Sequence, residues 1–290
     1  MFHWVFLILF LQILCRAMSA SSSCGDLQFL RHTGLDGVLY TETLVAEHVV
    51  EGGSLCTERC YRHPICNMLL YNTVSQRCRL YKSFVNTGGT DDTGWQYYAV
   101  DCNEFRLENA VSLAVVNQSV SVACRSGFSY FPSPQLLCHL DSGVINIGMC
   151  AQTRWTNQPY PFWTRLPAPL SSGAEISVRM AGEGENVSTI NLRTADSSHV
   201  FHFSIRWWKA EAVYNTRSAG GLWDTEITAS TFVFSPNVVH DISVRITPTH
   251  FLTFIDGDSF LEAPIRKRVE DVMSLSISVS YLESVELKYP

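Results

Sequence analysis

The chain has 290 residues, of which 46% are hydrophobic, 12% aromatic and 17% charged, an ordinary balance for a folded protein of two or three domains. Its formal net charge of −6 at pH 7 argues against a nucleic-acid partner, because such partners select a basic surface. All ten cysteines lie within residues 15–150, so the second half of the chain must fold without disulfides.

Residues 1–20 predict a secretory signal peptide. The apolar run Phe2–Leu14 precedes the small residues Ala17, Ser19 and Ala20, in the order of an apolar core and a cleavage region. The alternative is a membrane anchor, but the run is too short and too close to the N-terminus to favour one, and no later segment is apolar enough to span a bilayer. We therefore expect a secreted, extracellular protein, in which the sequon residues Asn117 and Asn186 are candidate glycosylation sites.

Residues 21–102 predict a small α+β domain stapled by disulfides. Cys56 and Cys60 are four residues apart and would share one face of a short helix. Extended stretches follow at Asn67–Tyr71, Arg77–Tyr81 and Trp95–Cys102. In a secreted chain, these cysteines predict disulfides rather than metal ligands.

The region contains six cysteines, Cys24, Cys56, Cys60, Cys66, Cys78 and Cys102. Their spacing resembles the apple/PAN family, in which a helix is stapled to a small sheet. The resemblance implies the pairs Cys56–Cys78 and Cys60–Cys66, with Cys24–Cys102 closing the ends, and protein partners for this domain. The closing bond would contribute about 4 kcal/mol in the chain-entropy model, because its loop is long.

Residues 103–150 resemble a degenerate sushi module. The match rests on Ser121–Phe128, on Leu136–Cys138 and on the later Cys150. Sushi modules pair the first cysteine with the third and the second with the fourth, which implies Cys124–Cys150.

One cysteine of the mature chain must stay odd, because nine remain after residue 20. Cys102 cannot bond both Cys24 and Cys138. Either the apple closure forms and Cys138 is odd, or the sushi pair forms and Cys24 is odd. We favour the first, and the odd thiol would allow a disulfide-linked homodimer.

Residues 151–290 predict a β-sandwich. The first fifteen, rich in Pro, Trp and Thr, are interpreted as a linker. Beyond them, short strands alternate with turns rich in Gly, Asn, Pro and Asp. We expect a hairpin at Phe251–Gly257 and closing strands at Ser274–Val279 and Ser284–Leu287.

One predicted strand has an unusual polar face. Val200–Trp207 alternates strictly, which places His202, Ser204 and Arg206 opposite the aromatic face. Val213 and Asn215 would share a face of the next strand, and Trp223 and Glu226 follow in a connection. Imidazole, hydroxyl and guanidinium groups suit the recognition of hydroxyls. The plainer alternative is a solvated strand face, with Trp223 at the rim of the core.

These residues resemble the galectin carbohydrate-recognition signature, and the similarity runs from about Trp155 to Pro290. Six positions match, whereas Ser204 stands where the family has Asn and Thr228 where it has Arg; the matches are His202, Arg206, Val213, Asn215, Trp223 and Glu226. The resemblance implies a jelly-roll β-sandwich, so that the chain as a whole is mostly β.

The resemblance also implies the role of each residue. His202 and Arg206 would bind the axial hydroxyl of galactose, and Asn215 and Glu226 its primary hydroxyl. Trp223 would cover the apolar face of the sugar. His202 is expected to bind as neutral imidazole beside Arg206, so that affinity falls below about pH 6. All of these residues are expected to stay partly exposed on one concave face.

The leading hypothesis is a secreted, calcium-independent lectin for β-galactoside-type glycans, with no enzymatic activity and no cofactor or metal. Ser204 is too short to replace the Asn amide and Thr228 removes a charge, so an altered or weakened specificity is expected. The second hypothesis is a secreted interaction or matrix protein whose sandwich has lost sugar binding. A third, a glycosidase on the same sandwich, requires two facing carboxylates about 5–10 Å apart.

Overall fold

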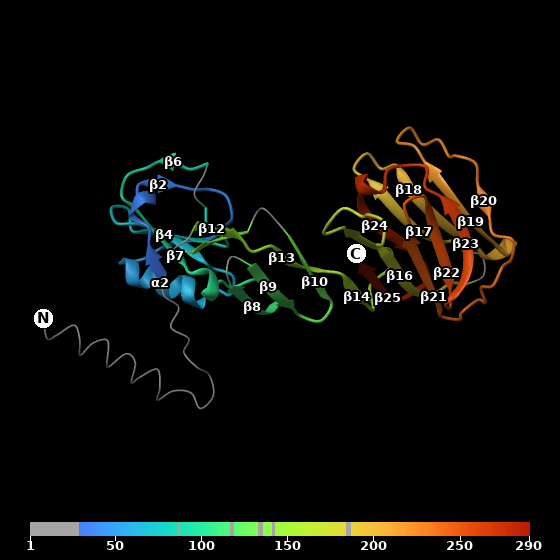
Figure 1. Ribbon diagram of the computed structural model, residues 1–290, viewed down its shortest axis with the longest axis horizontal. Coiled ribbons are helices and arrows are strands. Elements are labelled where there is room, and N and C mark those ends of the chain that lie inside the picture. Colours follow the sequence, from blue (N-terminus) through green and yellow to red (C-terminus); the bar gives the residue numbers. More distant parts are fainter. Residues whose placement is uncertain (1–28, 86–87, 117–118, 133–135, 141–142, 184–186) are drawn as a thin grey trace, which may run out of the picture. The chain divides into compact units, whose positions relative to one another are not determined.

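The computed structural model describes residues 29–85, 88–116, 119–132, 136–140, 143–183 and 187–290 (Figure 1). These residues are mostly β-strand, with one α-helix. The chain divides into two compact units, residues 1–108, 113–121 and 133–148 in the first and residues 109–112, 122–132 and 149–290 in the second. The expected signal peptide, Cys24, Asn117 and Asn186 lie outside the described residues. Within the described part, no helix has the length and apolar character needed to cross a membrane.

In the described part of the first unit, a single α-helix packs on an antiparallel sheet. Helix α2 (Gly53–Arg62) contacts β4 and β5 of a five-stranded sheet, whose order is β1 (Phe29–Arg31), β7 (Trp95–Val100), β4 (Met68–Asn72), β5 (Arg77–Tyr81) and β3 (Leu44–Val49). Cys56 and Cys60 are fully buried on one helix face, as the four-residue spacing predicts. Cys56–Cys78 joins the helix to β5, and Cys60–Cys66 closes the turn after it. The smaller elements are η1 (Thr33–Leu35), the pair β2 (Val38–Leu39) and β6 (Thr90–Asp91), and η2 (Cys102–Glu104).

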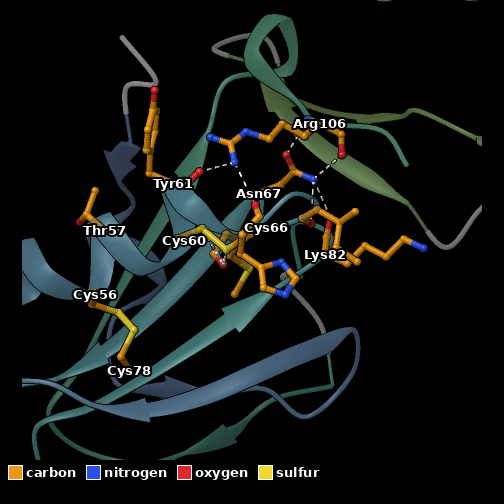
Figure 2. The surroundings of a disulfide bond; sticks show 12 residues. Cys56, Thr57, Cys60, Tyr61, Cys66, Asn67, Cys78, Lys82 and Arg106 are labelled. Carbon is orange, nitrogen blue, oxygen red and sulfur yellow. Dashed lines mark hydrogen bonds between the residues drawn. A yellow bond between two sulfur atoms is a disulfide. The ribbon is translucent and has the colours of Figure 1, made fainter. Parts of the chain in front are cut away.

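Asn67 ties three chain segments together beside the Cys60–Cys66 bond (Figure 2). Its amide donates to the carbonyl oxygens of Lys82 and Arg106, both at 2.9 Å, and its Oδ1 accepts from the Arg106 backbone N–H at 2.6 Å. The Arg106 guanidinium in turn donates to the carbonyl oxygens of Tyr61 (2.6 Å) and His63 (2.9 Å). Carbonyls at a helix C-terminus have no partner within the helix, so Arg106 caps α2.

Cys102 bonds Cys138, so the expected Cys24–Cys102 closure is wrong and Cys138 is not the odd cysteine. The cause is a long-range contact. Strand β11 (Leu137–Leu140) is held by hydrogen bonds from the Phe84 N–H to the Leu137 oxygen (3.0 Å) and from the Leu137 N–H to Ser83 Oγ (2.6 Å). This pairing brings the Cα atom of the adjacent Cys138 within 5.1 Å of that of Cys102.

The segment 103–150 is divided between the two units, and the sushi-like assignment is not confirmed. Its described residues form three short antiparallel pairs, and it contains the expected Cys124–Cys150 bond. The pairs are β8 (Ala110–Val116) with β9 (Ser119–Cys124), β11 with β12 (Gly143–Asn146), and β10 (Phe128–Phe131) with β13 (Met149–Gln152).

Two six-stranded antiparallel sheets form the sandwich of the second unit. In spatial order, the first contains β14 (Arg154–Thr156), β25 (Tyr281–Lys288), β16 (Glu175–Ala181), β21 (His240–Ile246), β22 (His250–Ile255) and β23 (Asp258–Pro264). The second contains β15 (Phe162–Arg165), β24 (Val272–Ser278), β17 (Val187–Thr194), β18 (His199–Arg206), β19 (Glu211–Arg217) and β20 (Ile227–Thr228). The turns η3 (Trp207–Lys209) and η4 (Val269–Asp271) complete the unit.

Residues 151–165 are not a linker, because they supply β14 and β15, one strand to each sheet. Trp155 and Phe162 are buried in the core, with ring centroids 5.7 Å apart. The expected hairpin is present as β22–β23, with its turn at Asp256 and Gly257, whose φ angles of 52° and 91° suit an Asp-Gly turn.

The sandwich core decides which residues of β18 point outward. Phe201 and Phe203 are buried against the first sheet, and the Phe201 ring centroid lies 4.9 Å from that of Phe251 on β22. Since side chains alternate along a strand, His202, Ser204 and Arg206 face the opposite side of the sheet.

Candidate functional site

The outer face of the second sheet brings the predicted site residues together. His202 on β18 lies directly opposite Asn215 on β19, so the two side chains share this face. Trp223 and Glu226 come from the loop between β19 and β20, where Trp223 forms a bridge with Arg217. Ser204 and Thr228 both lie opposite Val213, one on each side of it, and so belong to the same face.

Arg206 is held by two carboxylates. Its Nη1 donates to Glu226 Oε2 at 3.0 Å and its Nη2 donates to Glu226 Oε1, a two-point pair that fixes the guanidinium plane. Glu211 also accepts from Nη1, at 3.4 Å. The hydrogen bond to Glu226 is the main cause of the raised pKa of Arg206. Both paired groups remain accessible to a ligand, since the side chains of Arg206 and Glu226 are 23% and 41% exposed.

The loop that carries Trp223 and Glu226 is anchored on both sides. The Asp224 N–H donates to the Thr216 carbonyl at 3.0 Å, and the Asp224 carboxylate accepts from the Thr216 hydroxyl. Arg266 donates to the Thr225 carbonyl at 2.7 Å. These bonds position the two loop residues relative to β19.

A residue that the sequence analysis missed fixes the state of His202. Asn191 on β17 lies opposite His202, and the distance from its Oδ1 to His202 Nδ1 is 2.5 Å. An amide oxygen only accepts, so Nδ1 carries the proton and Nε2 is left as an acceptor. Burial, and then the nearby guanidinium of Arg206, lower the pKa of His202 to about 4.

Ser204 and Asn215 form the floor of the site. Each is only 2% exposed, so the expectation of partial exposure is wrong for Asn215. They are short side chains on inner strands of the sheet. The Oδ1 atom of Asn215 accepts from the Thr216 N–H at 2.8 Å, which leaves its Nδ2 hydrogens for another acceptor.

Trp223 is 47% exposed and therefore lies outside the inter-sheet core. Its ring centroid is 4.7 Å from that of His202 and 5.4 Å from that of His199. The Arg217 guanidinium carbon is 5.5 Å from the indole centroid. No pyranose fits between His202 and Trp223 in this arrangement, because each ring face alone needs about 3.5–4 Å to a contacting atom.

His199 joins the site through a bulge that the alternation of the strand does not predict. The β18–β19 register shifts between His199 and His202, so Val200 turns into the core while His199 contacts Trp223. Burial, and then the nearby Arg193, lower the pKa of His199 to about 4. In the sequence, the only indication of this bulge is the pair of polar residues at the start of the strand, Ser198 and His199.

Two family models match the chain. The galactoside-binding lectin model matches residues 161–287, and the PAN domain model matches residues 24–102. The chain thus contains an N-terminal apple/PAN-like domain followed by a C-terminal galectin-like β-sandwich.

Solved galectin structures are similar to the C-terminal part. Galectin LEC-6 of Caenorhabditis elegans is 22% identical with a TM-score of 0.44, and covers 47% of this chain and 96% of its own. Sheep galectin-11, solved with glycerol, is 17% identical with a TM-score of 0.41, at coverages of 45% and 99%. A double variant of human galectin-16 is 18% identical with a TM-score of 0.42, at coverages of 47% and 100%. No curated protein matches the chain.

Proposed function

We propose that this protein is a secreted lectin that binds β-galactoside-type glycans, without calcium, through the outer face of its second sheet. The observation that carries the proposal is the two-point pair of Arg206 and Glu226 beside the acceptor Nε2 of His202 and the half-exposed indole of Trp223. The match of residues 161–287 to the galactoside-binding lectin family supports it.

The site supplies the groups that a sugar hydroxyl needs. Arginine only donates and carboxylate only accepts, so Arg206 and Glu226 together satisfy both sides of a hydroxyl. His202 Nε2 adds a neutral acceptor next to Arg206, which suits an axial hydroxyl. Asn215 Nδ2 and Glu226 are assigned to the primary hydroxyl. An epimer whose hydroxyl points elsewhere leaves these groups unpaired and is rejected.

Sugar binding requires the Trp223 side chain to turn away from His202, because their contact fills the space above the site. Losing the ring contacts costs about 0.5–1.5 kcal/mol, which stacking on the sugar then offsets. The affinity of one domain is therefore expected to be weak, on the order of 0.1–1 mM. Useful avidity then requires more than one site, which a homodimer linked through Cys24 would provide.

The two departures from the family pattern change specificity. The buried Ser204 has no amide to offer a ligand, and Thr228 brings no charge to the same face. We assign the apple/PAN-like domain to protein partners, and no catalytic step to either domain. Both matched families are binding or interaction domains rather than enzymes.

A glycan array probed with the full-length protein, in a calcium chelator, tests the proposal. Terminal β-galactosides should be enriched among the bound glycans, and Arg206→Ala should remove the signal. As a matched control, Arg245→Ala removes an arginine that pairs with Glu175 on the other sheet and should leave the array pattern unchanged. Binding that disappears in chelator, or that survives Arg206→Ala, would contradict the proposal.

The second candidate is a protein-interaction or matrix protein whose sandwich binds no sugar. The closed contact between His202 and Trp223 favours it, as does the buried Ser204. In that case the array stays blank, although the protein is folded and captures its partner through the apple/PAN-like domain.

A further inference from the structure

A row of basic residues crosses the outer face of the second sheet next to the proposed sugar site. The strand registers place Arg165 opposite Ser274, Ser274 opposite Arg193, Arg193 opposite His199, and His199 opposite Arg217. We call Arg165, Ser274, Arg193, His199 and Arg217 the basic row.

The basic row lies on the same face as the sugar site. A parallel row of paired positions contains Trp163, Ser276, Asn191, His202 and Asn215. On most strands the two rows are two residues apart, which keeps side chains on one face at a separation of about 7 Å. On β18 the bulge brings His199 to that face instead of Val200.

The basic row has no carboxylate partner in the part of the chain that the structure describes. Among the described residues, no acidic side chain lies within ion-pair distance of Arg165, Arg193 or Arg217. In the sugar site, the carboxylates of Glu211 and Glu226 both pair with Arg206. Within the described residues, Arg217 donates only to the Gly221 carbonyl, at 3.3 Å. The positive charge of this part of the face is therefore uncompensated within the described chain.

Two buried polar atoms of the row are also unsatisfied. Arg193 Nε and His199 Nδ1 are buried and have no hydrogen-bond partner among the described residues, and His199 as a residue is only 5% exposed. A buried donor without an acceptor costs free energy, and the cost is larger for a charged group. An anion would satisfy these unpaired donors, because a guanidinium can bind two oxygens of a sulfate or carboxylate at once.

The row contacts the same indole that the sugar site uses. The His199 ring meets the Trp223 ring edge to face at 5.4 Å, and the Arg217 guanidinium carbon lies 5.5 Å from its centroid. A sugar bound over the parallel row of Asn191, His202 and Asn215 therefore has its neighbouring substituents next to the basic row, about 7 Å away along the strands.

We propose that the basic row binds an acidic group carried by the glycan, either a sulfate ester or the carboxylate of a sialic acid. This inference rests on the proposed sugar site and specifies its ligand class as acidic galactosides. The anion would pair with Arg193 and Arg217 and accept a hydrogen bond from the imidazole N–H of His199. Arg165, at the edge strand, would add long-range attraction.

The test compares lactose with monosulfated lactoses and sialyllactoses in calorimetric titrations of the full-length protein. We expect an acidic lactose to bind at least about tenfold more tightly than lactose, since a charged hydrogen bond is worth more than a neutral one. Arg193→Gln should reduce this ratio toward one while leaving the affinity for lactose unchanged. The sulfated and sialylated arms identify which acid the row prefers.

Arg165→Gln is a second variant that leaves the core untouched, because Arg165 is exposed on an edge strand. It should lower the preference for acidic ligands by a smaller factor, and added salt should lower it in the same direction. Arg245→Gln, on the other sheet, is the matched control and should have no effect. Lactose binding without any gain from the acidic group would overturn the basic-row proposal alone. A gain that survives both Arg193→Gln and Arg165→Gln would also overturn it. If no ligand of either kind binds, the proposed sugar site fails as well.

Discussion

Arg206 and Glu226 are joined at two points, with Nη1 donating to Oε2 at 3.0 Å and Nη2 donating to Oε1. Arg206→Lys keeps the charge but loses this two-point geometry, because an ammonium is a single point charge on a flexible stem. We expect lactose affinity to fall by about tenfold or more, measured by calorimetry on the full-length protein.

The control for this substitution is Arg245→Lys, which alters an arginine paired with Glu175 at 3.2 Å on the other sheet. It should bind lactose as the wild type does. An Arg206→Lys variant with unchanged affinity would show that the Arg206–Glu226 pair is only structural.

Trp223→Ala should abolish detectable binding, because it removes the only half-exposed indole in contact with His202 among the described residues. Trp208→Ala removes a tryptophan of similar exposure at η3, 53% against 47%, and should retain binding. The fluorescence of wild type and Trp208→Ala should change on sugar addition, since Trp223 turns away from His202. Retained binding by Trp223→Ala would place the glycan elsewhere.

The outer face of β18 was predictable from His202 onward. There the alternate residues Phe201 and Phe203 of the same strand are buried in the core, which turns the residues between them outward. The alternation failed at Val200 and His199, since a bulge depends on how two neighbouring strands pair and not on either strand alone. The role of Asn191 was hidden for the same reason, because it becomes visible only when β17 and β18 are in register.

The interpretation of residues 151–165 failed for a different reason. Their Pro and Trp content is typical of a linker, but Trp155 and Phe162 are core residues that meet across the two sheets. Aromatic residues are enriched in strands, and proline is tolerated on edge strands, so the aromatic residues were the better indicator of strands here.

Affinity for lactose should be constant from pH 7 to about pH 5 and half lost near pH 4. His202 must be neutral to accept from a sugar hydroxyl, and burial together with Arg206 lowers its pKa to about 4. The loss therefore occurs as pH falls through the lowered pKa, and the value of pH 6 expected from sequence is too high. Calorimetry and an NMR titration of the His202 ring measure both quantities.

The matched variant is His202→Gln, whose amide oxygen can still accept and does not titrate in this range. Its weaker binding should not change between pH 6 and pH 4.5. A wild-type protein that loses half its affinity near pH 6 would contradict the assigned environment of His202.

The Cys102–Cys138 bond should be recovered by peptide mapping under non-reducing conditions. Its residues are 36 apart in sequence, so its removal by Cys102→Ala with Cys138→Ala should cost about 4 kcal/mol of stability in the chain-entropy model. The control pair Cys60 and Cys66 is only 6 apart, and its removal should cost about 2 kcal/mol. A peptide linking Cys102 to Cys24 would contradict the observed pairing.

The most direct measurement compares lactose with cellobiose, two disaccharides that differ only in the axial or equatorial position of one hydroxyl. His202 Nε2 and Arg206 are proposed to bind the axial hydroxyl, and its inversion leaves both groups unpaired. In calorimetric titrations of the full-length protein, lactose should bind with a dissociation constant on the order of 0.1–1 mM, whereas cellobiose should bind at least about tenfold more weakly. Equal affinities for the two sugars would contradict the proposed galactoside site. So would the absence of binding to lactose and to its sulfated and sialylated derivatives.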